Sequence, residues 1–257
     1  MNFKEITSRD NALFKHIAKL QTTARYRAEN REFVAEGLRI CKDCIDTGVQ
    51  LKTLVLTREF AEKFPEQAAE FYQAATQKIV VPSAVFSKIS DTKNPQGILV
   101  IGEIPQKSTT DISVSGRYVA LENVADPSNL GAVSRTAEAL GVAGIILSDN
   151  GCDPYSPKAL RASMGTLLRM PVFVLDNFAE DLKNTGLKLY ACVVSGGKAI
   201  NTVDFSNGSA VLIGNEANGL TEAAVSVAEK ITIPMRGKAE SLNAAVAAAI
   251  AMWELMK

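Results

Sequence analysis

The sequence predicts two α/β domains in tandem, the second of which contains a mainly parallel sheet. Short apolar runs alternate with helix-patterned stretches along most of the 257 residues. Strands separated by helices are typical of parallel sheets covered on both faces. Residues 102–116 are polar and contain Pro, Ser and Thr, a composition typical of linkers. We therefore predict a domain over 1–103, a linker over 104–116 and a second domain over 117–257.

The N-terminal half is predicted to be an α/β sandwich. Leu13, Ile17 and Leu20 are spaced for one face of a helix. Gly48 ends a second helix, and Pro65 starts another at its first turn. The predicted helices cover 11–20, 38–46, 59–75 with a break at Pro65, and 82–90, and the predicted strands cover 33–34, 51–56, 79–81 and 97–101.

The C-terminal half is predicted to form the parallel sheet. Asp126 or Ser128 can cap the first helix of this half, and Ser241 can cap its last helix, which is rich in alanine. The predicted strands cover 117–122, 144–147, 172–175, 188–194, 210–214 and 230–233, and the predicted helices cover 128–140, 157–168, 221–227 and 242–257.

The chain contains one histidine, His16, which excludes several kinds of site. A single imidazole cannot form an HExxH motif, a His-Cys zinc cluster or a paired-histidine site, so we expect no metal. Cys41 and Cys44 form a CxxC pattern without the βαβ context of a redox motif, and we interpret them as buried thiols. Without an apolar signal region or a run of about 20 apolar residues, we expect a cytoplasmic protein that contacts no membrane.

The formal net charge of zero results from two unlike halves. Residues 1–110 hold 16 basic and 13 acidic side chains, whereas residues 111–257 hold 12 and 15. Arg25, Arg27 and Arg31 follow the first predicted helix in what we expect to be a loop. Guanidinium groups there could bind phosphate or stack on RNA bases. The alternative is a solvated basic surface.

Three segments combine residues that are unusual for a plain core. Asn129 and Arg135 lie on one helix, Glu216 lies in a loop after an apolar strand, and Ser241 and Asn243 follow another strand. Each segment also has a purely structural interpretation. Asn129 would cap a helix while Arg135 forms a surface ion pair, Glu216 would lie in an ordinary turn, and Ser241 would only cap the last helix. Neither GxGxxG nor a P-loop is present, so the domain binds a nucleotide by other means or binds none.

These segments resemble the three motifs of the SpoU-type (TrmH) RNA ribose 2′-O-methyltransferases. The resemblance rests on PSNLGAVSRTAEALG (127–141), LIGNEANGL (212–220) and IPMRGKAESLNAAVAAAI (233–250), with DPYSPKALRASMGTLLRMPV (153–172) between them. It covers the whole C-terminal half. The N-terminal half is similar, through residues 8–40, to the L30e-like domain that often binds the substrate in this family.

The resemblance implies a SPOUT fold with a deep trefoil knot, S-adenosylmethionine as cofactor and a homodimer formed through the knotted domain. It implies that the cofactor is framed by Gly214, Asn215, Ile233, Met235 and Leu242. It also implies catalytic roles for Asn129, Arg135, Glu216, Ser241 and Asn243. Arg135 would accept or polarise the proton of the ribose hydroxyl, Asn129 would position Arg135 or the ribose, and Glu216 would hold Arg135. Ser241 and Asn243 would orient the substrate or close the pocket.

The expected substrate is RNA, and ribosomal RNA is favoured over transfer RNA because an L30e-like domain is more typical of ribosomal enzymes. Arg161 and Ser163, at the start of a predicted helix, are candidates for phosphate binding. A non-catalytic RNA-binding or ribosome-assembly protein of the same fold is the alternative.

Overall fold

The computed structural model describes residues 3–6 and 11–257, so the first three residues of the L30e-like segment 8–40 lie outside it. The chain divides into two compact units. Unit 1 comprises Met1–Pro105 together with Tyr155–Arg161, and unit 2 comprises Gln106–Pro154 and Ala162–Lys257. A short segment from the second half of the sequence therefore belongs to the first unit.

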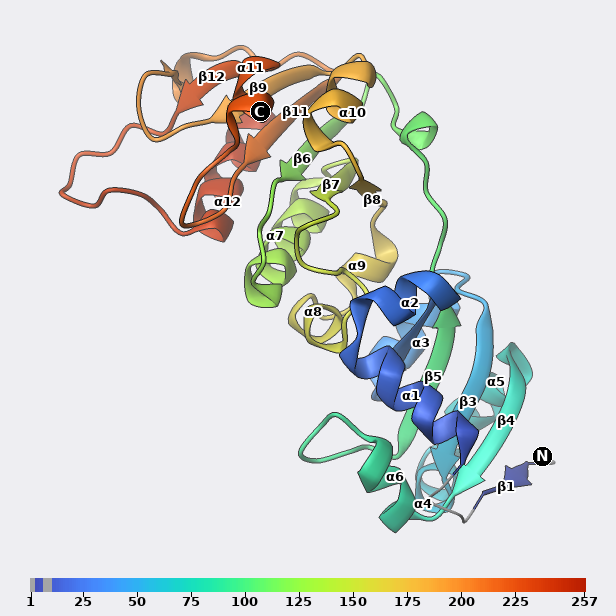
Figure 1. Ribbon diagram of the computed structural model, residues 1–257. Coiled ribbons are helices and arrows are strands. Elements are labelled where there is room, and N and C mark those ends of the chain that lie inside the picture. Colours follow the sequence, from blue (N-terminus) through green and yellow to red (C-terminus); the bar gives the residue numbers. More distant parts are fainter. Residues whose placement is uncertain (1–2, 7–10) are drawn as a thin grey trace. The chain divides into compact units, whose positions relative to one another are not determined.

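Unit 1 is built on a mixed five-stranded sheet (Figure 1). Its order is β1 (Lys4–Glu5), β4 (Ala75–Val81), β3 (Leu51–Thr57), β5 (Ile98–Glu103) and β2 (Glu32–Glu36). The first three strands are parallel, and β5 is antiparallel to both of its neighbours. The helices of this unit are α1 (Ala12–Thr22), α2 (Ala24–Asn30), α3 (Leu38–Asp46), α4 (Arg58–Lys63), α5 (Pro65–Ala74), α6 (Ser83–Ile89) and most of α8 (Pro157–Ala162).

Local signals placed several of these elements correctly. Pro65 occupies the first turn of α5, as predicted. Ile17 and Leu20 of α1 pack with Val85 and Phe86 of α6 over the sheet in one buried cluster. The predicted loop after α1 is instead the helix α2.

Cys41 and Cys44 are buried, free thiols on α3, which confirms their interpretation. Burial raises the pKa of the Cys44 thiol to about 12, so it stays protonated near neutral pH. The two residues are therefore small apolar members of the core rather than a redox pair.

Unit 2 contains a seven-stranded sheet in which every pairing is parallel, which confirms the predicted architecture. Its order is β10 (Lys198–Ala199), β12 (Glu229–Thr232), β9 (Lys188–Cys192), β11 (Ser209–Ile213), β6 (Arg117–Leu121), β7 (Gly144–Ser148) and β8 (Val172–Leu175). The helices are α7 (Pro127–Leu140), α9 (Thr166–Arg169), α10 (Phe178–Asn184), α11 (Glu222–Ser226) and α12 (Ala244–Leu255).

The predicted helix over 157–168 is wrong in one respect, because it is interrupted between α8 and α9. Met164 and Gly165 have φ angles of 52° and 87°, which a continuous α-helix does not allow. Helix α10 is absent from the predicted elements. Near the linker, Thr109–Asp111 forms one turn of 3₁₀ helix closed by a capping box at Ser108.

Helix α7 starts at the end of β6 and lies close to its neighbours. Asp126 is its cap, accepting a hydrogen bond of 2.9 Å from the Ser128 amide. A Cβ on Gly131 would lie 2.6 Å from the carbonyl carbon of Ala162, so this glycine permits close backbone packing. Helix α12 packs against both α7 and β11. The start of α12 and the start of α7 are thereby brought to the same edge of the sheet.

Candidate active site

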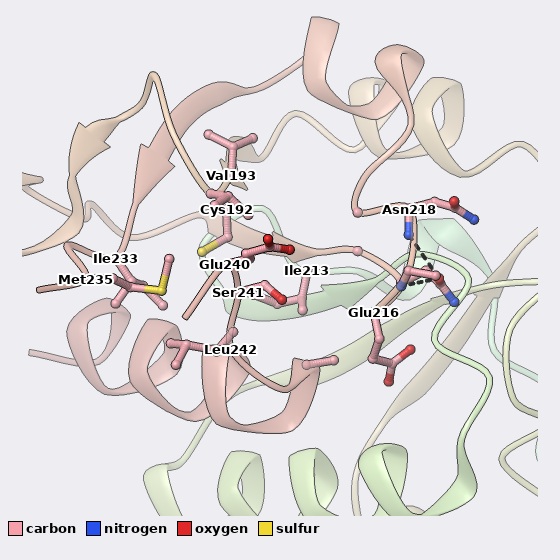
Figure 2. A pocket seen from close by; sticks show the side chains of 17 residues that line it. Cys192, Val193, Ile213, Glu216, Asn218, Ile233, Met235, Glu240, Ser241 and Leu242 are labelled. Atoms are coloured by element: carbon pink, nitrogen blue, oxygen red, sulfur yellow. Dashed lines mark hydrogen bonds between the residues drawn. The ribbon is translucent and has the colours of Figure 1, made fainter. Parts of the chain in front are cut away.

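The candidate site lies where the carboxyl ends of β9, β11 and β12 meet. The strands are adjacent and parallel, so the segments that leave them converge at one edge, where open α/β sheets bind ligands. A cavity of about 420 Å³ opens there (Figure 2). This volume lies within the range of small-molecule sites.

All five residues predicted to frame the cofactor line this cavity. Gly214 and Asn215 come from the loop after β11, whereas Ile233, Met235 and Leu242 come from the segment between β12 and α12. Val193 and Ile213 add apolar surface. The cavity therefore offers backbone groups and apolar side chains, which suits a nucleoside better than a polyphosphate.

The glycine at 214 is required by the path of its own loop. A Cβ at Gly214 would lie 2.1 Å from the carbonyl carbon of Gly219 and 2.2 Å from the amide nitrogen of Leu220. The loop is closed by a hydrogen bond of 2.8 Å from the Gly219 amide to the Asn215 carbonyl. A side chain at position 214 would therefore collide with the backbone of the same loop, which forms one wall of the cavity.

Polar side chains attach this loop to the end of β6. The Asn215 amide donates to the Asn123 carbonyl at 2.9 Å, and its oxygen accepts from the Ala217 amide at 2.9 Å. The buried Glu122 carboxylate accepts from the Thr221 amide and hydroxyl, both at 2.8 Å. Sequence reasoning missed Glu122. The available signal was a carboxylate directly after an apolar strand.

Three of the predicted catalytic residues form one hydrogen-bonded cluster. The Asn129 amide donates to Glu216 Oε1, and the Asn243 amide donates to Asn129 Oδ1 at 3.1 Å. These residues come from α7, the loop after β11 and the start of α12. Because Glu216 also lines the cavity, the cluster adjoins the proposed cofactor site.

Ser241 and Asn243 have different positions from those expected. Ser241 lines the cavity, but it does not cap α12. Asn243 is the cap, because its Oδ1 accepts from the Ala245 amide at 3.0 Å and the Val246 amide at 3.3 Å. Asn243 thus joins the helix to Asn129.

Two substitutions separate the capping of α12 by Asn243 from its hydrogen bond to Asn129. Asn243→Ala should lower the free energy of unfolding by about 1 kcal/mol through loss of the cap. Asn243→Asp keeps the capping oxygens but removes the donor to Asn129, so it should retain the melting temperature and lose much of the methylation rate. Thermal unfolding and initial rates measure the two effects. Equal rates for wild type and Asn243→Asp would remove the hydrogen bond to Asn129 from the mechanism.

Arg135 lies on the exposed side of α7, about 1.7 turns beyond Asn129. It forms no hydrogen bond or ion pair within the described part of the chain. The expectation that Asn129 or Glu216 holds Arg135 is therefore not met in this structure, where those two residues bind each other.

The basic residues of unit 1 divide into exposed and buried ones. Arg25 is exposed and pairs with Glu29 at 2.7 Å, and Arg31 is exposed with a φ of 54°. Arg27 is only 4% exposed, and its guanidinium donates to the Leu20 carbonyl. The prediction that Arg27 contacts RNA is therefore corrected, because its side chain supports the packing of α1 and α2.

The two candidates for phosphate binding near α8 also differ. Arg161 belongs to unit 1 and pairs with Asp91 at 2.8 Å, leaving its side chain partly accessible. Ser163 is fully buried, and its carbonyl accepts from the Thr166 hydroxyl at 3.0 Å. The structure therefore corrects the prediction for Ser163, whose side chain does not reach the surface.

Over residues 3–6 and 11–257, no group of three or more His, Cys, Asp or Glu side chains is placed to hold a metal ion. No helix in the same residues is long and apolar enough to cross a membrane. The parallel sheet, the edge cavity and the polar cluster from three separate segments form the ligand-binding site of an α/β enzyme.

Comparison with known proteins identifies the family. Residues 116–253 match the SpoU rRNA Methylase family, and residues 11–100 match the MRM3-like substrate binding domain. The chain belongs to the SpoU rRNA Methylase family. The prediction of an S-adenosylmethionine-dependent methyltransferase is thereby confirmed.

The relatives match over nearly the whole chain. A 23S rRNA (guanosine(2553)-2′-O)-methyltransferase, RlmP of Bacillus subtilis, is 28% identical and is matched over 98% of this chain and 99% of its own. The AdoMet-bound rRNA methyltransferase of Sinorhizobium meliloti is 34% identical, with a TM-score of 0.87 and coverage of 98% and 97%. The SpoU methyltransferase AviRb of Streptomyces viridochromogenes, in complex with AdoMet, is 26% identical, with a TM-score of 0.81 and coverage of 96% and 98%.

Proposed function

We propose that this protein transfers a methyl group from S-adenosylmethionine to a ribose 2′-hydroxyl of ribosomal RNA. The observation that carries the proposal is the cluster of Asn129, Glu216 and Asn243 at the rim of the cavity. In this proposal the cluster supplies polar groups for an acceptor nucleotide beside the cofactor site. The relatives that match the whole chain and are named as ribosomal RNA methyltransferases support the choice of substrate.

The residues of this chain fit the cofactor. The backbone around Gly214, Ile233 and Leu242 would frame the nucleoside, and Val193, Ile213 and Met235 would offer it apolar surface. When bound, the cofactor supplies an electrophilic methyl group on a positively charged sulfur. The absence of a phosphate-binding glycine loop agrees with a cofactor that carries no phosphate.

The remaining task is to position the 2′-hydroxyl and increase its nucleophilicity. Holding the hydroxyl oxygen about 3–3.5 Å from the methyl carbon would supply much of the rate. We assign Arg135 to the RNA side of the site, where its fixed charge polarises the hydroxyl together with an RNA phosphate. A guanidinium with a pKa above about 12 is a poor base, so polarisation is the role that its chemistry favours.

Mapping of 2′-O-methylated nucleotides in cells with and without this protein tests the proposal. Loss of one ribosomal RNA site, restored by the purified protein with cofactor, is the expected result. If methylation is lost only at a transfer RNA nucleotide, transfer RNA is the substrate instead of ribosomal RNA. Unchanged maps together with no cofactor binding in calorimetry would favour the non-catalytic RNA-binding alternative.

We propose that Arg25 and Arg31 contribute to RNA binding by unit 1. Both are exposed, and Arg27 provides an internal comparison because it is buried. Arg25→Gln with Arg31→Gln should weaken RNA binding at low salt and reduce the slope of log K against log salt by about 1 for each phosphate group that is no longer neutralised. Titrations at several salt concentrations measure this. An unchanged slope would show that these residues form only a solvated surface.

We also propose that unit 2 contains the family's trefoil knot, dimerises through it and works in the cytoplasm. Val246 and Trp253 on α12 are 48% and 58% exposed and lie seven residues apart, so they share one helix face. A second copy would cover this apolar strip. Light scattering should give a dimer for wild type and a monomer for Val246→Glu with Trp253→Ser. A monomeric wild-type protein at micromolar concentration would contradict the dimer.

A further inference from the structure

The cofactor cavity has an uncompensated negative charge. Of the seventeen residues that line it, Glu216 and Glu240 are acidic, and none is Lys, Arg or His. The Cys192 thiol does not add charge, because burial raises its pKa to about 11. Arg236 and Lys238 lie on the same segment as Glu240 but do not line the cavity.

The two carboxylates differ in what they already bind. Glu216 accepts a hydrogen bond from Asn129, as described above. Glu240 forms no hydrogen bond or ion pair with any residue that the structure describes. Glu240 lines the cavity together with Cys192 and Ser241 (Figure 2). The Glu240 oxygens are therefore available to a bound molecule.

The reaction changes the charge of the molecule in this cavity by one unit. S-adenosylmethionine carries a sulfonium, an ammonium and a carboxylate, so its net charge is +1. After the methyl group has left, the sulfur is a neutral thioether and S-adenosylhomocysteine has a net charge of zero. A carboxylate near the cavity therefore discriminates between reactant and product by charge alone.

We propose that Glu240 is a specificity-determining residue that favours binding of the sulfonium cofactor over binding of its demethylated product and thereby reduces product inhibition. The inference rests on the assignment of this cavity to S-adenosylmethionine. Because positive charge on sulfur decreases toward the transition state, Glu240 stabilises the bound reactant more than the transition state. It increases cofactor selectivity without accelerating the chemical step.

Calorimetry with three ligands tests this role. The ligands are S-adenosylmethionine, S-adenosylhomocysteine and sinefungin, an analogue that carries an amino group in place of the methylsulfonium and shares the +1 charge. Glu240→Gln should weaken binding of the two charged ligands about fivefold and leave the neutral one unchanged. A modest factor is expected because an exposed carboxylate is screened by water. Added salt should also reduce the preference of the wild-type protein for the two charged ligands over S-adenosylhomocysteine.

Two further variants and three further measurements make the result specific. Glu240→Asp keeps the charge and should retain much of the preference. Glu180→Gln makes the same change of charge on an exposed residue of α10 outside the cavity and should alter none of the affinities. Single-turnover methylation by Glu240→Gln at saturating cofactor should be faster than wild type by up to about fivefold, because the variant loses stabilisation of the bound reactant. Inhibition by S-adenosylhomocysteine relative to KM should become stronger. Melting temperatures without ligand verify folding.

Two outcomes would overturn the proposal in different ways. If Glu240→Gln weakens binding of all three ligands equally, or weakens none, Glu240 does not respond to the sulfonium charge. The assignment of the cavity to the cofactor would stand in that case. Failure of the wild-type protein to bind any of the three ligands would reject the cofactor site itself and this inference with it.

Discussion

Arg135→Ala is expected to lower the methylation rate by roughly 10²- to 10⁴-fold, the range typical of a group that assists proton transfer. The substitution should leave the fold intact, because Arg135 is exposed on α7 and forms no bond to a described residue. Changes at such surface positions usually alter stability by less than about 0.5 kcal/mol. Cofactor affinity should also be retained, since Arg135 does not line the cavity.

Three measurements on one preparation decide the Arg135 prediction. Mass spectrometry of the modified RNA gives the rate, calorimetry gives the cofactor affinity, and thermal unfolding gives the stability. Arg135→Lys is the matched control, because it keeps the charge but loses the planar donor geometry, and its rate should fall between the other two. Near-normal 2′-O-methylation by Arg135→Ala would remove this residue from the mechanism.

Gly214→Ala is expected to reduce cofactor affinity by about 100-fold or more. The added Cβ would approach the backbone of Gly219 and Leu220 to 2.1 and 2.2 Å, distances that require the loop after β11 to move. Backbone atoms cannot rotate out of the way as a side-chain end can. The displaced loop would carry Asn215 and Glu216 with it, so the cavity wall and the polar cluster would be disrupted together.

Gly237→Ala provides the control for this prediction. Gly237 lies in the other loop that borders the cavity, and a Cβ there would meet no heavy atom within 4 Å. Its cofactor affinity should match that of wild type in the same calorimetric titration. Wild-type affinity in Gly214→Ala would contradict the role of the tight 214–219 loop as the cofactor wall.

Local sequence signals were sufficient for most elements of both units. The helix start at Pro65 and the alternation of apolar runs with helices depend on neighbouring residues only, and the structure agrees with them. The helix break at Met164 and Gly165 was missed, because a helical pattern of apolar residues continues through it. Residue type gave no warning that Met164 adopts a positive φ.

For the functional residues, too, the sequence predicted some features and not others. Motif residues pointed to the cavity lining, and Gly214, Asn215, Ile233, Met235 and Leu242 do line one cavity. Their partners could not be inferred, since Glu216 binds Asn129 rather than Arg135 and Asn243 rather than Ser241 caps α12. Each of these choices is made between atoms of segments far apart in the sequence.

The sequence by itself determined the α/β class, the family and the cofactor, because periodicity and motif chemistry are properties of short stretches of chain. Only the tertiary structure decided that Arg27 and Ser163 are buried, that Glu122 binds Thr221, and that the free carboxylate of Glu240 faces the cavity. Burial and hydrogen-bond partnership depend on which distant segments meet. That meeting is set by the packing of α7 and α12 at one edge of the parallel sheet.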